Sequence, residues 1–174
     1  WFREIGYQVV FTRTLITRAL LFIAGGGLTA AVLYLNLRIA QRGLVANPIL
    51  LQLAESAPRL NLTVALRRLS VPLSLGLGLL GAFAATAAWD VVLRAIYATP
   101  FGIADPVFSR DVGFYVFALP ALSTALGFLL TLTILSLLLV IPVYGVRGDL
   151  VPSPRGLRIE PSAGLHIAIL LAAF

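Results

Sequence analysis

The sequence contains no cysteine, no methionine and no lysine, and it has one histidine, His166. The lack of cysteine excludes a disulfide framework, a thiolate metal site and a cysteine nucleophile within these 174 residues. Because no methionine is present, Trp1 is not expected to be a natural start, and we expect a piece of a longer protein. Charged residues make up only 11% of the chain, against roughly 25% in ordinary globular domains.

Apolar residues, in contrast, are abundant. They make up 60% of the sequence, and the mean hydropathy is +1.00. A single soluble core does not bury that much apolar surface, whereas a bilayer does, because lipid is itself an apolar solvent. The composition also excludes a disordered tail and a collagen-like chain. We therefore predict an all-α protein, a polytopic transmembrane helix bundle with interfacial helices.

Long uncharged runs mark the predicted membrane spans. A span of about 20 apolar residues crosses the hydrocarbon core. The predicted spans are residues 19–37, 69–89 and 121–141, with a truncated fourth span from residue 164. The first two carry small residues four apart, which allow a second helix to approach closely: Gly26 with Ala30, and Gly78 with Ala82. The triplet Gly25–Gly27 indicates either such packing or a hinge or substrate-lining break.

Prolines and flanking segments set the expected limits of these helices. Pro72 is placed in the first turn of the second span, where a missing N–H does little harm. Pro120 is expected to divide the uncharged stretch 112–146 into a short aromatic interfacial segment, 112–119, and the third span. Residues 48–55 are predicted to form a short interfacial helix with an apolar face.

The 13 basic residues are all arginine and exceed the 7 acidic residues, which gives a net charge of +6. Most flank the apolar runs, as cytoplasmic loop arginines do, so we expect no nucleic acid partner. The segments 38–68 and 147–163 hold eight arginines together, against five in 1–18 and 90–120. This asymmetry predicts that loops 38–68 and 147–163 are cytoplasmic and that loop 90–120 is extracytoplasmic.

The loop after the second span carries the densest group of polar and aromatic residues. Asp90 and Arg94 are spaced to pair on a helix, Asp105 before Pro106 suits a turn, and Asp111 is placed to cap a following helix. The structural interpretation is a folded loop held by caps and ion pairs, and the functional one is a substrate or partner surface. The candidate interaction residues are Asp90, Arg94, Asp105, Arg110, Asp111, Phe114, Tyr115 and Phe117.

Other chemistry finds little support in the sequence. Three carboxylates in one loop suit a divalent cation, but the spacing of a calcium-binding loop is absent, and we predict no metal. His166, at the mouth of the last span, suits a proton relay or a metal or haem ligand, or a hydrogen-bonded interface residue. Nucleophile-elbow, P-loop and zinc-protease motifs are absent from the sequence, and no G-x-G-x-x-G follows a predicted strand. The glycines Gly76 and Gly78 lie inside a predicted span, where they indicate helix packing rather than phosphate binding. We therefore predict no catalytic residues and no cofactor.

Several stretches resemble uncharacterised protein family 0182, a group of large multi-pass bacterial membrane proteins. They are the segments 1–7, 17–18 and 36–40 and, most specifically, 101–117 (FGIADPVFSRDVGFYVF). Ala104 and Ser109 depart from the family pattern, which has Thr or Ser at the first position and Gly at the second. The resemblance implies an N-terminal set of membrane spans, part of which is this chain, followed by a large extracytoplasmic domain. It implies the same topology as the arginine count.

Two functions follow as hypotheses. The first is a structural or accessory component in the bacterial inner membrane, in contact with membrane lipids and packed against the helices or subunits of a larger membrane complex. The second is a transporter or channel domain, which requires polar groups that converge on a cavity inside the membrane. The predicted spans offer only hydroxyl side chains for such a path, for example Thr29, Thr86 and Thr131.

Overall fold

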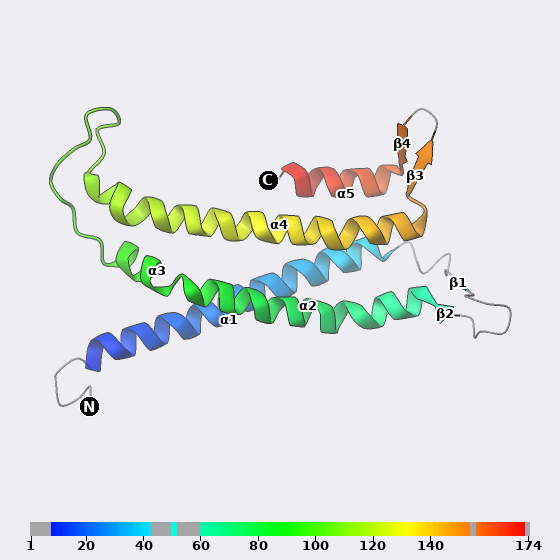
Figure 1. Ribbon diagram of the computed structural model, residues 1–174, viewed down its shortest axis with the longest axis horizontal. Coiled ribbons are helices and arrows are strands. Elements are labelled where there is room, and N and C mark those ends of the chain that lie inside the picture. The colour runs from blue at the N-terminus through cyan, green and yellow to red at the C-terminus, as the bar shows by residue number, and fades with distance from the viewer. Residues whose placement is uncertain (1–7, 43–49, 52–59, 154–155, 173–174) are drawn as a thin grey trace. The chain divides into compact units, whose positions relative to one another are not determined.

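The computed structural model describes residues 8–42, 50–51, 60–153 and 156–172. Its elements are shown in Figure 1. The helices are α1 (Gln8–Ala40), α2 (Leu62–Ala87), α3 (Trp89–Ile96), α4 (Leu119–Arg147), preceded by a π-helical turn (Phe114–Ala118), and α5 (Pro161–Ala172). Two short antiparallel hairpins pair β1 (Leu50–Leu51) with β2 (Leu60–Asn61), and β3 (Leu150–Ser153) with β4 (Gly156–Ile159).

In the part of the chain that the structure describes, three helices are long and apolar enough to cross a membrane: Gln8–Ala40, Val64–Ala87 and Phe114–Arg147. They contain 33, 24 and 34 residues. At roughly 1.5 Å per residue, even the shortest exceeds the hydrocarbon thickness of about 30 Å. The predicted all-α fold class is confirmed.

The helices extend beyond the predicted spans. Helix α1 begins 11 residues before the predicted start at residue 19 and so contains Arg13 and Arg18. An arginine marks the edge of an apolar run, but it is a good helix former and does not end the backbone helix. Both arginines have aromatic partners: the Arg18 guanidinium carbon lies 4.5 Å from the Trp89 ring centroid, and that of Arg13 lies 4.8 Å from the Tyr97 ring centroid.

The expected position of Pro72 is wrong. Pro72 lies inside α2, ten residues after its start, rather than in its first turn. The Ser70 and Ser74 hydroxyls donate to the carbonyls of Arg67 and Ser70, both at 2.7 Å, and so bond the backbone around the proline.

Pro120 does not divide the third apolar stretch. The backbone is helical from Val112 to Arg147, with the π-helical turn directly before Pro120. A π-turn shifts the hydrogen-bond register by one residue, and we attribute the tolerance of Pro120, which has no N–H, to this shift. The predicted separate interfacial segment 112–119 is therefore the first part of the third long helix.

The connecting segments also differ from the prediction. The predicted interfacial helix 48–55 lies mostly outside the described residues, and its described part, Leu50–Leu51, is strand β1. The predicted loop 147–163 contains the β3–β4 hairpin, which was not anticipated. Gly148 and Gly156 adopt positive φ angles of 80° and 122° beside its strands, a conformation that favours glycine.

The chain divides into two compact units, each made of parts of the same long helices. The first comprises Trp1–Leu28 and Gly78–Leu129. In it, small residues allow α1 and α2 to approach closely. A Cβ placed on Gly26 would lie 2.8 Å from Ala82 Cβ and 3.1 Å from the Gly78 carbonyl oxygen. The helix continues unbroken through the glycine triplet, and Phe22 and Phe83 meet edge to face beside this contact.

The second unit comprises Thr29–Leu77 and Leu130–Phe174. Helix α5 lies beside the C-terminal part of α4 (Figure 1). The buried core of this unit joins α1, α4 and α5 through Leu37, Ala40, Val140, Val143, Tyr144 and Ala163.

We expect Gly26→Ala to destabilise the protein by about 1–3 kcal/mol, because the new methyl group overpacks the contact with Ala82. Gly27→Ala is the matched control, since a Cβ at Gly27 meets no atom within 4 Å. Thermal unfolding in detergent measures both. Equal melting temperatures for the two variants would contradict the assigned contact.

Candidate functional site

The segment between α3 and α4 is a loop whose backbone is held by two aspartates. Asp111 accepts three backbone hydrogen bonds, from Phe101 (3.0 Å), Gly102 (2.8 Å) and Gly113 (2.7 Å). The bond from Gly113 caps the first turn of the helical run that follows, as predicted. These N–H donors, Phe101 and Gly113 foremost, hold the pKa of Asp111 below its ordinary value, although desolvation opposes them.

Asp105 orders the tip of the same loop. Its carboxylate accepts hydrogen bonds from the backbone of Val107 (3.2 Å) and Phe108 (2.7 Å) and from the Tyr115 hydroxyl (3.3 Å). The predicted turn at Asp105 is therefore present. Its backbone N–H also donates to the Arg110 carbonyl (2.7 Å), which closes the tip.

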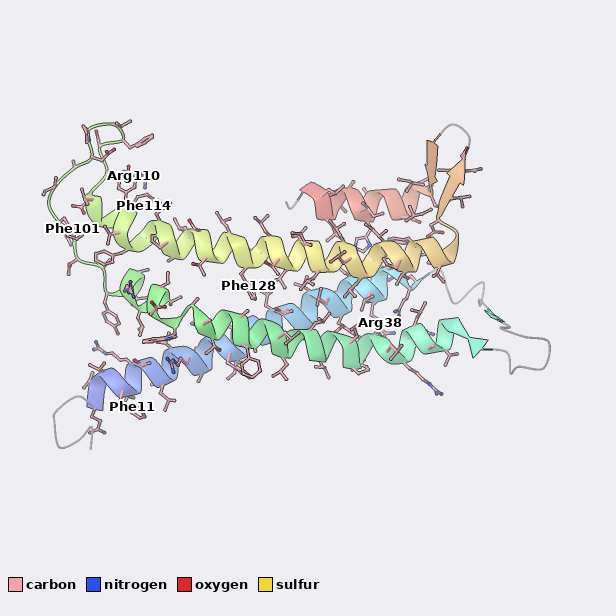
Figure 2. The ribbon with its side chains drawn as sticks, in the orientation of Figure 1. Phe11, Arg38, Phe101, Arg110, Phe114 and Phe128 are labelled. Atoms are coloured by element: carbon pink, nitrogen blue, oxygen red, sulfur yellow. The ribbon has the colours of Figure 1, made fainter. Side chains whose placement is uncertain are left out.

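Aromatic contacts attach the loop to the helical run. The Arg110 guanidinium carbon lies 4.7 Å from the Phe114 ring centroid, and the rings of Phe101 and Phe117 stack with centroids 5.9 Å apart. Figure 2 labels Phe101, Arg110 and Phe114 at this end of the chain's fourth helix. Six of the eight candidate interaction residues are thus brought together: Asp105, Arg110, Asp111, Phe114, Tyr115 and Phe117.

The other two candidates, Asp90 and Arg94, pair with each other on α3. Their ion pair measures 2.8 Å, as the spacing predicted. The Arg94 side chain is 67% exposed, so the pair is solvent-screened and adds little stability. Helix α3 itself contacts the π-helical turn.

The loop exposes three large apolar side chains. The relative exposures of Ile103, Val107 and Phe108 are 64%, 76% and 71%. The carboxylates beside them are engaged by backbone N–H groups. We call these three residues the loop tip, a rigid apolar surface on a hydrogen-bonded frame.

A second polar site, in the second unit, joins four side chains from α1, α4 and α5. His166 Nε2 lies 2.8 Å from Asn36 Oδ1, and its Nδ1 lies 2.9 Å from the Tyr144 hydroxyl oxygen. The Asn36 amide nitrogen donates to the Val32 carbonyl (2.8 Å) and to Ser136 Oγ (3.3 Å). We call Asn36, Ser136, Tyr144 and His166 the buried polar cluster. Asn36, Ser136 and Tyr144 were not predicted as members. Asn36 and Ser136, for example, lie 100 residues apart in the sequence.

The protonation of this cluster follows from its partners. Asn36 Oδ1 accepts only, so His166 Nε2 carries the proton, and Nδ1 of the neutral ring accepts from the Tyr144 hydroxyl. Both ring nitrogens are therefore engaged, and the ring has no lone pair left for a metal. Of the alternatives for His166, the geometry favours a hydrogen-bonded interface residue.

Arg147 closes the end of this unit. It donates to the Ala40 carbonyl at 2.6 Å, and its guanidinium carbon lies 5.1 Å from the Tyr144 ring centroid. It also forms an ion pair with Asp149 at 3.1 Å, although Asp149 Oδ2 lacks hydrogen-bond alignment. Arg147 therefore ties the C-terminal ends of α1 and α4 together.

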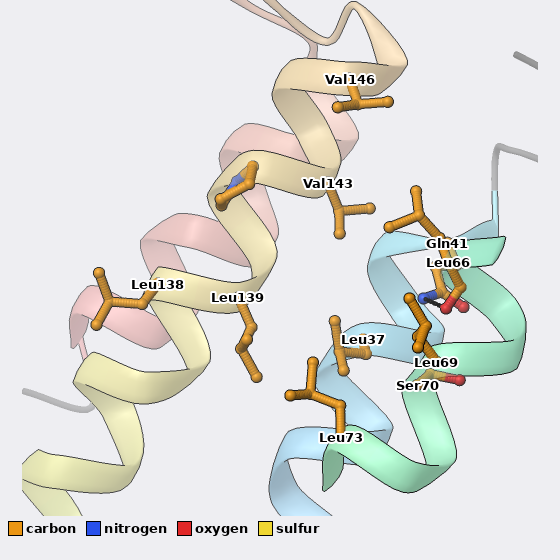
Figure 3. Close-up of a pocket in the computed structure, with 11 residues that line it drawn as sticks. Leu37, Gln41, Leu66, Leu69, Ser70, Leu73, Leu138, Leu139, Val143 and Val146 are labelled. Atoms are coloured by element: carbon orange, nitrogen blue, oxygen red, sulfur yellow. Dashed lines mark hydrogen bonds between the residues drawn. The ribbon is translucent and has the colours of Figure 1, made fainter. Parts of the chain in front are cut away.

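A cavity of about 220 Å³ lies between α1, α2 and α4 in the same unit (Figure 3). Its wall is mostly aliphatic and includes Leu37, Leu66, Leu73 and Leu139. Gln41 reaches the wall and donates to the Leu66 carbonyl at 3.2 Å. Such a lining suits a hydrocarbon chain better than a polar substrate.

The model of the Uncharacterised protein family (UPF0182) matches residues 1–174. UPF0182 proteins of Cupriavidus necator, Trichlorobacter lovleyi and Rhodococcus jostii are 38%, 34% and 31% identical to the chain, each across 100% of it. The chain spans 19%, 20% and 18% of the length of these relatives. No solved structure matches the chain.

We expect Asp111→Ala to open the loop, because three backbone N–H groups lose their acceptor. Cleavage of the loop by chymotrypsin at neutral pH is expected to accelerate about fivefold, the effect of losing a helix cap. Asp90→Ala, which removes only an exposed ion pair, serves as the control and leaves the rate unchanged. Acid has the same effect as Asp111→Ala: with a lowered folded pKa, the contribution of Asp111 is present above the unfolded pKa and is lost as the pH falls through the folded pKa. Unchanged protease resistance in Asp111→Ala would refute the capping role.

Ser109 has a φ of 54°, a left-handed conformation that is unfavourable for residues with a Cβ. We expect Ser109→Gly to stabilise the loop by about 1 kcal/mol, because glycine removes this strain. Ser109→Ala keeps the Cβ and is the matched control. Chymotrypsin cleavage of the loop is slowed by the glycine variant alone, and equal slowing by alanine would contradict the strain argument.

Proposed function

The chain belongs to the Uncharacterised protein family (UPF0182), and from this premise we propose that it is a structural or accessory component of a larger membrane complex in the bacterial inner membrane. The whole protein's activity is part of the proposal, because the chain spans about a fifth of its relatives' length.

The distribution of polarity supports the membrane part of the proposal. Hydroxyl side chains are buried, for example Ser70, Ser74 and Ser136, whereas large apolar side chains point outward, such as Leu20, Ile23 and Leu80. Water would penalise this arrangement, since a contiguous exposed apolar surface is unfavourable in a soluble protein. Lipid or neighbouring helices satisfy it. The arginine asymmetry supports loops 38–68 and 147–163 on the cytoplasmic side and loop 90–120 outside.

The single observation that carries the accessory role is the loop tip. Ile103, Val107 and Phe108 are more than 60% exposed on a loop that Asp105 and Asp111 hold rigid. A preorganised apolar surface binds a partner without the entropic cost of ordering it. The partner we propose is a protein subunit with an apolar pocket, at the extracytoplasmic face.

The second candidate function, a transporter or channel domain, has less support. It requires polar groups that line a path through the membrane. The members of the buried polar cluster bond one another instead, and the cavity between α1, α2 and α4 is lined mostly by aliphatic residues. A water-filled path past Thr29, Thr86 and Thr131 would favour the transporter or channel function over the accessory role.

We also propose that no residue of this chain takes part in a catalytic step. Asp105 and Asp111 are the acidic groups of the loop, and both are committed to backbone N–H donors. Their role as acceptors for the loop backbone accounts for both carboxylates without a proton-transfer step.

Site-specific photo-crosslinking in native membranes tests the accessory role. A photoreactive residue at Phe108 is expected to capture another protein, whereas the same residue at Ile96 is the control, because Ile96 is equally exposed (65%) but lies on α3 outside the loop tip. Adducts of Phe108 only with lipid or with the protein itself, together with recovery of the protein alone in mild detergent, would refute the proposal.

A further inference from the structure

An apolar groove runs between α1 and α2 in the second unit. Its volume is about 270 Å³. Ala30, Ala31 and Tyr34 of α1 and Val71 and Leu75 of α2 line it. The small alanines leave the space open, and the apolar lining suits an acyl chain.

A polar cavity of about 340 Å³ lies at the ends of the same two helices. Arg38 and Arg42, at the C-terminal end of α1, and Arg67, near the start of α2, line it together with Gln41. Figure 2 labels Arg38 near the end of α1. Three guanidinium groups around one cavity suit a phosphate, which they bind through charge-assisted hydrogen bonds.

Helical spacing places the two cavities in line. Residues four apart lie on one face of a helix, one turn above another. Ala30, Tyr34, Arg38 and Arg42 form one such row on α1, and Arg67, Val71 and Leu75 form another on α2. The apolar groove therefore continues into the arginine cavity toward the C-terminal end of α1 and the N-terminal end of α2.

The charge of this cavity is unbalanced within the described residues. There, none of the three arginines has an acidic partner; Arg38 contacts the Tyr34 ring, with its guanidinium carbon 5.3 Å from the ring centroid. Gln41 is 3% exposed, and in the described part of the chain its Oε1 accepts no hydrogen bond. An anion relieves the repulsion among the arginines.

We propose that this groove binds an anionic phospholipid, with the phosphate between Arg38, Arg42 and Arg67 and one acyl chain against Ala31, Tyr34 and Val71. Charge selects the headgroup, and the apolar groove distinguishes a lipid from a soluble phosphate. The inference rests on the membrane location proposed above. Cell fractionation tests that location separately, so the membrane location and the lipid site can fail independently.

Native mass spectrometry of the full-length protein in detergent tests this site, with phosphatidylglycerol and phosphatidylcholine of identical acyl chains as probes. We expect retention of phosphatidylglycerol in preference to phosphatidylcholine. Arg67→Gln is expected to weaken phosphatidylglycerol binding about fivefold, the effect of one basic residue at a lipid surface. Arg68→Gln is the matched control: it removes the same charge from the neighbouring residue, which does not line the cavity.

Two further measurements identify the ligand. Ala31→Phe fills the groove and is expected to weaken lipid binding, while inorganic phosphate is not expected to displace the lipid. Displacement by inorganic phosphate with no effect of Ala31→Phe would indicate a soluble phosphate site and overturn the proposal. Equal retention of the two lipids, or equal losses in Arg67→Gln and Arg68→Gln, would overturn it as well. Thermal unfolding verifies that each variant is folded, and Arg38→Gln replaces Arg67→Gln if the latter is not.

Discussion

An apolar surrounding offers no hydrogen-bond partner, so a polar side chain buried between these helices needs one inside the chain. The buried polar cluster shows how this need shapes the second unit. Asn36 bonds its own helix, Ser136 of α4 and His166 of α5, and Tyr144 completes the set. These bonds fix which faces of α1, α4 and α5 meet. Many leucine and isoleucine side chains of these helices are left exposed.

The two units expose different chemistry. In the first, Asp105 and Asp111 accept backbone hydrogen bonds, and the loop exposes the apolar side chains of Ile103, Val107 and Phe108. In the second, Arg38, Arg42 and Arg67 have no acidic partner among the described residues, so that the surface on offer is cationic. An apolar surface suits a protein partner, and a cationic cavity above an apolar groove suits a lipid. The two proposals therefore depend on separate residues.

Local features of the sequence predicted the local structure well. The pair Asp90–Arg94 and the bonds of Asp105 and Asp111 are present, because each depends on residues that are close in sequence and on the geometry of one turn. Small-residue spacing indicated close helix approach at Gly26, but only the structure shows that Ala82 faces it.

Features that depend on distant or compensating residues could not be predicted. Asn36 and His166 form a hydrogen bond although they lie 130 residues apart in the sequence, and the local sequence around either residue does not indicate its partner. Pro72 and Pro120 were expected at helix starts, since an isolated helix breaks at proline. Inside this fold, serine hydroxyls bond the backbone around Pro72, and a π-turn precedes Pro120. Arg13 and Arg18 stay within α1 because their guanidinium groups contact the rings of Tyr97 and Trp89.

The contact between Asn36 and His166 also has a consequence for how the protein is made. Synthesis proceeds from the N-terminus, so α1 leaves the ribosome long before α5 does. During that interval the Asn36 side-chain oxygen lacks the His166 donor, although its amide nitrogen can still bond Val32 of the same helix. The second unit therefore completes this hydrogen bonding only when α5 has been made, and until then the Asn36 oxygen depends on water or on another donor.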